Sequence, residues 1–192
     1  LSGLVGSEMC IRDRKWPERD WVSIDDVSPT LIKTVIASED QRFCTHWGID
    51  LVELTNVMAT RSVPARGAST ISMQVVKNVW LWPGRSYIRK AIEIPLAVFA
   101  DLFWGKRRMM EIYLNIAEWG DGLYGAQAAA QLYFNKPASQ LTLDEAARLA
   151  AVLPNPIRRN PLRAGRAAAR IIERADQLST ETACINQSHS LL

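Results

Sequence analysis

Apolar residues recur three and four positions apart along most of this chain, which is the spacing of one face of an α-helix. Residues 29–41 give the first clear case, because Leu31, Ile32, Val35 and Ile36 would lie on one side of a helix there. A Ser-Pro pair directly before these residues favours a helix start, with serine as the N-cap and proline in the first turn. The pattern therefore predicts a helix over residues 29–41 with one buried face.

The same periodicity predicts helices along the rest of the chain, and no stretch shows the alternation typical of a strand. Pro95 lies inside one predicted helix and is expected to kink or end it. The fold class that follows is mainly α. The further predicted helices cover residues 50–60, 85–104, 106–119, 126–134 and 166–178, with two more that open at Ser69 and at the capping box Thr142–Glu145.

The bulk composition is that of one globular domain. The 192 residues are 48% apolar and 22% charged, and the net charge of +3 is too small to argue for nucleic acid. The longest apolar run, residues 94–104, is shorter than the roughly 18–20 residues of a membrane span and is broken by Pro95 and Asp101. Four of the seven tryptophans fall between residues 80 and 119, where they could form core, a sugar platform or a membrane-interface belt.

The two ends of the chain differ from its centre. Residues 8–13 resemble a translated sequencing adaptor, so we expect residues 1–14 to be foreign and the natural N-terminus to be missing. Residues 15–178 then form the domain, and the polar residues 179–192 are expected to be disordered. With Cys10 set aside, Cys44 and Cys184 indicate neither a disulfide framework nor a metal-binding spacing.

Glu39 is the first candidate for chemistry. It lies three residues after Ile36 and four after Val35, so it shares their apolar face, and it falls in the last turn of the predicted helix. Partial burial and the helix dipole both raise the pKa of a carboxyl group there, which suits a general base or acid near neutral pH. A carboxylate paired with an arginine or lysine is the structural alternative.

Residues 66–78 form a second informative stretch. In a helix that opens at Ser69, the side chains of Thr70, Gln74 and Lys77 share a narrow polar stripe. Hydroxyl groups at a helix N-terminus with a lysine nearby suit an anion or a phosphate, although the Gly-Lys-Ser/Thr ending of a Walker motif is absent. An ordinary amphipathic surface helix is the alternative.

Helical spacing also joins Glu93 to Arg89 at i,i+4 and to Lys90 at i,i+3. These charges form either a solvated face or an acidic group beside cations that bind phosphates. His46 has no metal-ligating partners nearby in the sequence and is expected to hold its loop by hydrogen bonds. The apolar turn 80–84 either projects into a membrane surface or folds back onto the core.

Together these stretches resemble the peptidoglycan glycosyltransferases of bacterial cell-wall synthesis, whose five motifs occur in the family's order across roughly residues 28–160. Met73 stands where many members have Gln, and Ala68 where many have Gly. The matching residues are Glu39, Asp40, Phe43, His46 and Gly48 in the first motif; Gly67, Ser69, Thr70, Gln74, Lys77 and Asn78 in the second; Arg89, Lys90 and Glu93 in the third; Glu111, Tyr113, Leu114 and Asn115 in the fourth; and Gly125, Ala128, Ala129, Tyr133 and Phe134 in the fifth.

The resemblance implies a lysozyme-like fold with a smaller, membrane-facing lobe. It also implies that lipid II is polymerised into β-1,4-linked glycan strands, with inversion and release of undecaprenyl pyrophosphate. Glu39 would be the general base for the acceptor sugar's 4-hydroxyl, and Glu93 the second catalytic acidic residue, near the donor pyrophosphate. Fixed cations would stabilise the leaving group as negative charge develops on it. The substrate-binding residues that the resemblance implies are Asp40, Phe43, His46, Ser69, Thr70, Gln74, Lys77, Asn78, Arg85, Arg89 and Lys90.

The resemblance further implies partners and a location. Lipid II and the growing lipid-linked glycan chain would be bound at a membrane surface, with cell-wall synthesis proteins as further partners and no nucleic acid. No prosthetic group is expected, and a divalent cation, Mg²⁺ or Mn²⁺, would bind near Glu93 if one takes part. The catalytic domain would lie in the periplasm at the inner membrane, and the family's N-terminal membrane helix is expected to have been lost with the natural N-terminus.

Three alternatives remain open at this point. A lysozyme-like hydrolase would need an acid and a route for water, but not the cations Lys77, Arg85 and Lys90. A non-catalytic helical module that binds anionic lipid or nucleic acid would explain the cations but not Glu39. A fragment of a bifunctional penicillin-binding protein would need a Ser-x-x-Lys region, which does not occur after residue 160.

Overall fold

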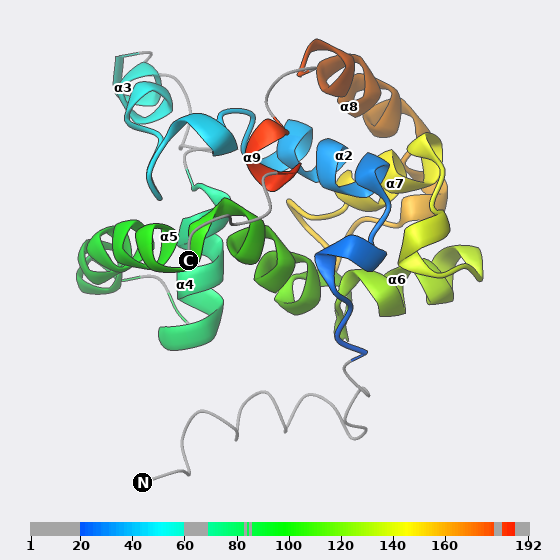
Figure 1. The fold of residues 1–192 in the computed structure, drawn as a ribbon, viewed down its shortest axis with the longest axis horizontal. Coiled ribbons are helices and arrows are strands. Elements are labelled where there is room, and N and C mark those ends of the chain that lie inside the picture. Colours follow the sequence, from blue (N-terminus) through cyan, green and yellow to red (C-terminus); the bar gives the residue numbers. More distant parts are fainter. Residues whose placement is uncertain (1–19, 60–68, 83, 85, 179–181, 187–192) are drawn as a thin grey trace, which may run out of the picture.

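The computed structural model describes residues 20–59, 69–82, 84, 86–178 and 182–186. It is mostly helical, which confirms the predicted fold class, and Figure 1 shows two groups of helices joined by the long helix α5. The short 3-10 helices are η1 (Ile24–Asp26), η2 (Phe43–Thr45), η3 (Ala138–Gln140) and η4 (Pro161–Arg163). The α-helices are α2 (Pro29–Glu39), α3 (Leu51–Ala59), α4 (Ile71–Trp80), α5 (Tyr87–Ile116), α6 (Ala126–Phe134), α7 (Leu143–Ala150), α8 (Gly165–Gln177) and α9 (Ala183–Asn186).

The larger group forms around α2, which packs against α7 and α8. The apolar face of α2 that the sequence predicts is buried, and Leu31, Val35 and Ile36 are fully inaccessible. Ser28 precedes α2 as its N-cap, and the capping box of Thr142 and Glu145 opens α7, as the sequence predicts. This packing fixes the C-terminal end of α2, where Glu39 is the last helical residue.

The smaller group consists of α3, α4 and the first half of α5, on the left of Figure 1. Helix α4 packs along α5 and begins at Ile71. Its N-cap is Thr70, not Ser69, because the Thr70 hydroxyl accepts the hydrogen bond of the Met73 amide. Helix α5 continues through Pro95, so of the two expected effects of this proline a helix end does not occur. Its backbone leaves helical geometry at Gly105, whose φ of 70° is open to glycine, and this agrees with the predicted division into helices 85–104 and 106–119.

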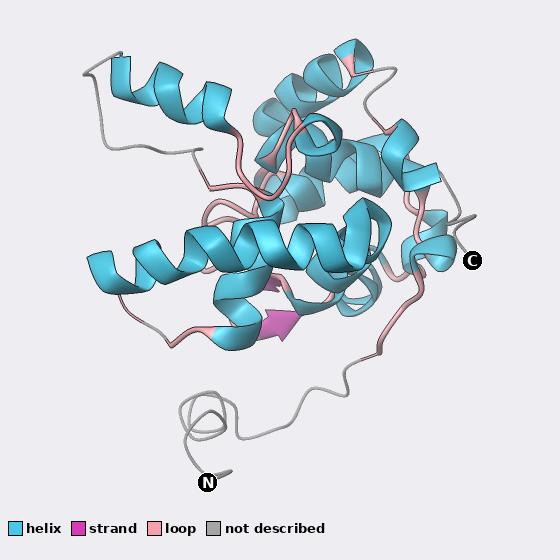
Figure 2. Cartoon of the chain, turned by 60° about the vertical axis from the view of Figure 1, so that its left-hand side comes forward, coloured by secondary structure: helices cyan, strands magenta, loops and turns pink. Residues whose placement is uncertain are grey.

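A small antiparallel hairpin follows α5 (Figure 2), where the sequence predicted no strand. Its strands are β1 (Glu118–Gly120) and β2 (Leu123–Tyr124), joined by a turn in which the Gly122 amide donates to the Glu118 carboxylate over 3.0 Å. Strands of three and two residues are too short to produce an alternating pattern, which is why the prediction failed.

A disulfide joins Cys44 in η2 to Cys184 in α9, across 140 residues of sequence. The expectation that these cysteines form no disulfide is therefore wrong. The expectation of a disordered tail is also wrong for residues 182–186, because α9 packs against α5 and Ile185 is buried. Two cysteines so far apart in sequence give no local signal, since their pairing depends on the tertiary fold.

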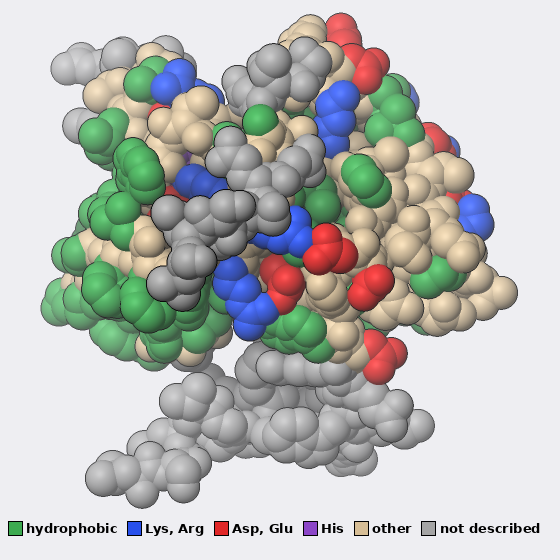
Figure 3. Space-filling model, in the orientation of Figure 1, with side chains coloured by type: hydrophobic (Ala, Val, Ile, Leu, Met, Phe, Trp, Pro, Cys, Tyr) green, Lys and Arg blue, Asp and Glu red, His purple; other side chains and the backbone are tan. Residues whose placement is uncertain are grey.

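Exposed apolar side chains gather on the smaller group, where Figure 3 shows a continuous hydrophobic surface. The largest are Trp80, Trp82, Tyr87, Ile88, Phe99, Leu102 and Phe103. Trp80 stacks on Trp104, and Phe99 stacks on Phe103. Trp80, Phe99 and Phe103 are exposed, whereas Trp104 is partly buried and packs against the core.

Among the described residues, no helix combines the length and the hydrophobicity that crossing a bilayer requires.

Candidate active site

Glu39 ends α2 at the junction of the two helix groups. Its side chain is half-buried, and its carboxylate accepts hydrogen bonds from Gln74 Nε2 at 3.0 Å and from Ser38 Oγ at 3.4 Å. Burial raises the pKa of Glu39 above its ordinary value of 4.5; the nearby charge of Asp40 adds to this, and the bonds from Gln74 and Ser38 oppose it. The raised pKa that the sequence predicts is therefore confirmed, and its main cause is desolvation.

Gln74 connects Glu39 to the centre of α5. It lies on α4, donates to Glu39 through its amide nitrogen and accepts the phenolic hydrogen bond of Tyr113 at its amide oxygen over 3.4 Å. Tyr113 is buried, and desolvation raises its pKa well above the ordinary value of 10.0, so its phenol stays protonated and remains a donor. The amide of Gln74 is thus oriented with its N–H toward the carboxylate.

The Asp40 carboxylate is buried and holds the first motif in place by hydrogen bonds. One carboxylate oxygen lies 2.9 Å from His46 Nε2, and the other accepts the Ile71 amide hydrogen bond at 2.9 Å. Asp40, His46 and Phe43 are all buried, and Thr70 Oγ1 donates to the Gly48 carbonyl at 2.5 Å. The loop role predicted for His46 is confirmed, and these side chains hold the start of α4 against the end of α2.

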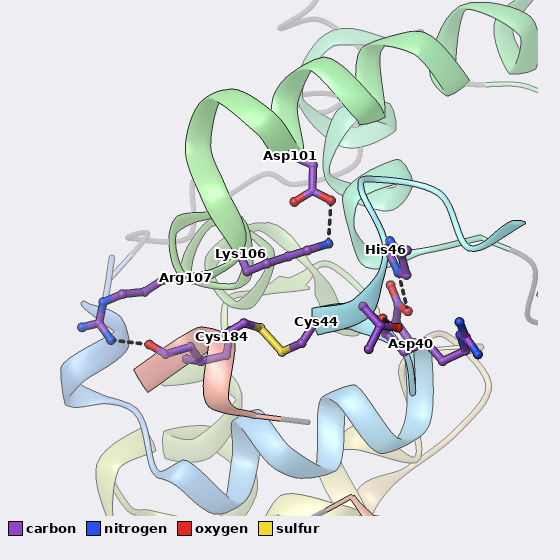
Figure 4. Close-up of a disulfide and its surroundings, with 10 residues drawn as sticks. Asp40, Cys44, His46, Asp101, Lys106, Arg107 and Cys184 are labelled. Atoms are coloured by element: carbon purple, nitrogen blue, oxygen red, sulfur yellow. Dashed lines mark hydrogen bonds and ion pairs between the residues drawn. A yellow bond between two sulfur atoms is a disulfide. The ribbon is translucent and has the colours of Figure 1, made fainter. Parts of the chain in front are cut away.

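Asp101 and Lys106 form a second set of polar contacts, which the sequence did not predict (Figure 4). Asp101 accepts hydrogen bonds from the Gly48 amide and from Ser72 Oγ, and it pairs with Lys106 Nζ at 2.6 Å. Lys106 Nζ also lies 4.5 Å from the centre of the Phe43 ring, which is cation–π geometry. A charged residue inside an apolar run was the available sequence signal for Asp101.

The third motif forms a compact cluster on α5. Glu93 is buried, and its two oxygens each lie 2.7 Å from a cation, Arg89 Nη1 and Lys90 Nζ. The predicted i,i+4 and i,i+3 pairs are therefore confirmed. Lys90 Nζ is also 3.4 Å from Ser69 Oγ, which joins this cluster to the beginning of α4.

Lys77 lies on α4, three residues after Gln74, the hydrogen-bond partner of Glu39. Partial desolvation lowers its pKa from the ordinary value of 10.5; Arg89 and Lys90 act in the same direction, whereas Glu93 and Glu39 oppose it. The charges of Glu39 and of the Glu93 cluster therefore both act on this lysine. Contacts with α4 connect both candidate groups, because Gln74 donates to Glu39 and Ser69, directly before the helix, lies 3.4 Å from Lys90 of the Glu93 cluster.

The other residues of the motifs have mixed placements. Asn78 is exposed on α4, beside Lys77. Arg85 lies outside the described residues.

In the fourth motif, Asn115 makes paired hydrogen bonds of 2.8 Å to the Val22 backbone, and Glu111 accepts from the Ile24 amide at 3.3 Å. Those two side chains fasten the chain before α2 to α5 and so have a structural role.

The described residues include no group of three or more histidine, cysteine, aspartate or glutamate side chains able to hold a metal ion. Glu93 supplies a single carboxylate, and both of its oxygens already bind cationic side chains. Mg²⁺ requires several oxygen ligands in octahedral geometry. The side chains present therefore do not form a Mg²⁺ or Mn²⁺ site by themselves.

Comparison with known proteins agrees with this arrangement of motifs. Residues 7–182 match the family model described as Transglycosylase, a match that begins inside the segment expected to be foreign. Whether residues 1–14 are foreign stays a prediction.

Curated relatives are similar over most of the chain. A biosynthetic peptidoglycan transglycosylase of Mesorhizobium japonicum is 56% identical over 163 residues, covering 82% of this chain and 69% of that protein. The proteins of the same name from Rhizobium meliloti and Brucella suis are 51% and 52% identical, each over 80% of this chain and over 66% and 69% of their own lengths. The chain thus spans about two thirds of the length of these relatives, and it belongs to the transglycosylase family of glycosyltransferase enzymes.

Proposed function

We propose that the chain is a peptidoglycan glycosyltransferase that polymerises lipid II into β-1,4-linked glycan strands. The names of the matched relatives and the order of the five motifs support this function. The observation that carries it is the pair of contacts at α4, where Gln74 donates to the Glu39 carboxylate at 3.0 Å and Ser69 lies 3.4 Å from Lys90 of the Glu93 cluster. A base and a set of phosphate-binding cations then serve one transfer reaction.

Glu39 acts as the general base in this proposal. Its carboxylate takes the proton of the acceptor sugar's 4-hydroxyl as that oxygen attacks the anomeric carbon of the donor. The bond from the anomeric carbon to the pyrophosphate oxygen breaks, and the electron pair leaves with undecaprenyl pyrophosphate, with inversion at the carbon. A raised pKa suits this role, because a more basic carboxylate accepts the proton more readily near neutral pH.

The cations stabilise the departing pyrophosphate. Arg89 and Lys90 pair with Glu93, and Lys77 interacts with it electrostatically. Fixed positive charges stabilise negative charge that develops in the transition state. Glu93 then orients the side chains of Arg89 and Lys90 while they bind the phosphates. Ser69, Gln74, Asn78 and Arg85 complete the donor site in this proposal.

Asp40, Phe43, His46 and Thr70 contribute to substrate binding indirectly in this proposal. Their burial leaves little side-chain surface for a ligand, and their hydrogen bonds join the end of α2 to the start of α4. They therefore maintain the distance between the Glu39 base and the cations.

The exposed aromatic surface of α5 is proposed to rest on the outer face of the bacterial inner membrane. Amphipathic helices with aromatic and aliphatic side chains on one face bind at the headgroup boundary. Lipid II carries its sugar outside the bilayer, so a site beside such a surface would reach it. The Cys44–Cys184 disulfide is in keeping with a periplasmic location, because disulfides persist in oxidising compartments.

A divalent ion is not needed for any step above. Mg²⁺ or Mn²⁺ bound near Glu93 would have to take most of its ligands from pyrophosphate oxygens and water. Partner proteins of cell-wall synthesis likewise stay a prediction from the resemblance.

Purified protein in detergent should convert lipid II into polymer and release undecaprenyl pyrophosphate. The same preparation should leave preformed, uncrosslinked glycan strands intact. Cleavage of those strands without consumption of lipid II would contradict the proposal and favour a lysozyme-like hydrolase. Salt-sensitive binding to anionic vesicles with no turnover would favour a non-catalytic lipid-binding module.

A further inference from the structure

The disulfide holds the loop that directly follows Glu39. Cys44 follows Glu39 and Asp40 and precedes His46, and it belongs to η2 (Figure 4). The bridge to Cys184 connects this loop to a segment almost at the other end of the chain. No other covalent link within the described residues joins the first motif to a distant part of the chain.

The segment that carries Cys184 is itself fixed to the long helix. Arg107 on α5 donates to the Ile185 carbonyl at 3.0 Å and forms an ion pair with Asp25 at 2.5 Å. The Ile185 side chain is only 2% exposed and packs with the hydrophobic core. Helix α9 is therefore held in place by contacts of its own, and the disulfide connects Cys44 to it.

The loop is held from two other directions by weaker contacts. On one side the Asp40–His46 hydrogen bond connects its two ends, and on the other Lys106 lies over the buried Phe43 ring. These contacts are reversible, and neither of them involves Cys44. Phe43 also anchors η2 by its burial in the core, and Thr45 donates to the Arg42 carbonyl from its amide and its hydroxyl group. The bridge is thus the covalent restraint on η2, at its central residue.

We propose that the Cys44–Cys184 disulfide is a positioning device for the catalytic loop, so that the rate of transfer depends on its oxidation state. The inference rests on the proposed function, because the rate in question is that of lipid II polymerisation. Cys44 and Cys184 act through the loop that follows Glu39 and touch neither substrate nor reacting atoms. Misplacing a catalytic group by about 1 Å can cost about 100-fold in rate, so releasing one restraint has a measurable effect.

The redox step is ordinary thiol–disulfide exchange with a dithiol reductant. The dithiol gives two electrons and two protons to the bridge, and the Sγ–Sγ bond breaks to leave thiols on Cys44 and Cys184. The reductant closes to its own disulfide. Reoxidation by an added disulfide reverses each of these changes.

The experiment uses the whole chain with Cys10→Ser as the parent, since a third thiol could exchange with the bridge. Thiol titration of the denatured, unreduced parent should find no free thiol, and titration after reduction should find two. The kcat and KM for lipid II are then measured on oxidised, reduced and reoxidised parent, with circular dichroism on the same samples. We expect reduction to lower kcat by about tenfold with the helical signal retained, and reoxidation to restore it.

Serine variants give an independent test. Cys44→Ser, Cys184→Ser and the double variant should lower kcat equally, because each removes the same bond. If the loss in log kcat were twice as large in the double variant as in either single variant, the two cysteines would not act through one shared bond. Arg107→Gln, which loosens α9 but keeps the bridge, should have a smaller effect than either serine variant.

The outcomes separate this inference from the proposed function. If the oxidised parent does not polymerise lipid II, the proposed function fails. If it does, an unchanged kcat in folded, reduced protein overturns the inference, as would free thiols in the unreduced protein. A fall in kcat that only follows loss of helical signal would make the bridge a general stabiliser and would also overturn it.

Discussion

The side-chain amide of Gln74 donates to the Glu39 carboxylate over 3.0 Å, and this bond limits the rise of the Glu39 pKa. Desolvation raises the pKa of Glu39, whereas the Gln74 hydrogen bond lowers it. Tyr113 fixes the orientation of the Gln74 amide from the other side. The catalytic carboxylate is therefore tuned by two opposing effects, one from packing and one from a single side chain on α4.

Replacing Gln74 with Leu should raise the pKa of Glu39 further, since the hydrogen bond that favours the charged form is lost. A hydrogen bond to a charged group contributes about 1.5–3 kcal/mol to the stability of the charged form. The acid limb of the kcat/KM profile should therefore move to higher pH. Gln131→Leu, at an exposed position on α6, is the matched control. An acid limb that stays in place in Gln74→Leu would contradict the tuning.

Lys77 should set the opposite limb of the same profile. Transfer needs its positive charge, and desolvation lowers its pKa below 10.5, so activity should begin to fall at a pH below that value. Lys77→Arg keeps the charge at all accessible pH values, because a guanidinium is not deprotonated. The variant should therefore lose the alkaline limb even if its maximal rate is lower. Identical alkaline limbs in the two proteins would assign the limb to another group.

Gly48 should not tolerate a side chain. Its φ is 76°, and a Cβ atom there would lie 2.5 Å from the Ala97 carbonyl oxygen, which is backbone and cannot move freely. Gly48→Ala should therefore lower the free energy of unfolding by at least about 3 kcal/mol, measured by urea denaturation. Gly84→Ala is the matched control, because φ is 111° but no atom lies within 4 Å of the added Cβ.

The control should cost about 1–2 kcal/mol from backbone strain alone. Equal destabilisation by the two alanines would mean that the close approach of the first-motif loop to α5 is not required.

The apolar surface of α5 should bind lipid. Phe103 is 76% exposed and stacks on Phe99, so Phe103→Ser removes an aromatic group from the proposed contact. Burial of such a side chain contributes about 1.5–3 kcal/mol, so vesicle affinity should fall roughly tenfold or more. Leu132→Ser on α6, where Leu132 is 66% exposed, is the control and should bind as the parent does. Equal loss in both variants, measured by vesicle sedimentation, would contradict the assignment of the surface.

The sequence predicted the helices well because most of them are amphipathic or carry clear caps. Residues 126–134 were predicted within their observed bounds, and the capping box at Thr142 marked the start of α7. The predicted division into helices 85–104 and 106–119 is confirmed, because the backbone of α5 leaves helical geometry at Gly105. The helix continues through Pro95, where the sequence allowed either a kink or an end.

The candidate site was predicted less completely than the fold. Spacing on one helix found the Arg89, Lys90 and Glu93 cluster, because partners three and four residues apart are visible in the sequence. The contacts of Asp101 with Gly48 and Ser72, and the bond between Cys44 and Cys184, join residues far apart in sequence. Such pairs carry no periodic signal and appear only when the elements are packed.

The most direct test of the account is the initial rate of lipid II polymerisation by Glu39→Gln beside Glu173→Gln, an exposed carboxylate on α8. Glu39→Gln keeps the shape of the side chain but cannot accept a proton, so the rate should fall by at least about 100-fold. It should stay folded, because it removes a carboxylate that burial disfavours in its charged form at neutral pH. Glu173→Gln should keep the parent rate. Equal rates in Glu39→Gln and in the parent would contradict the assignment of Glu39 as the base.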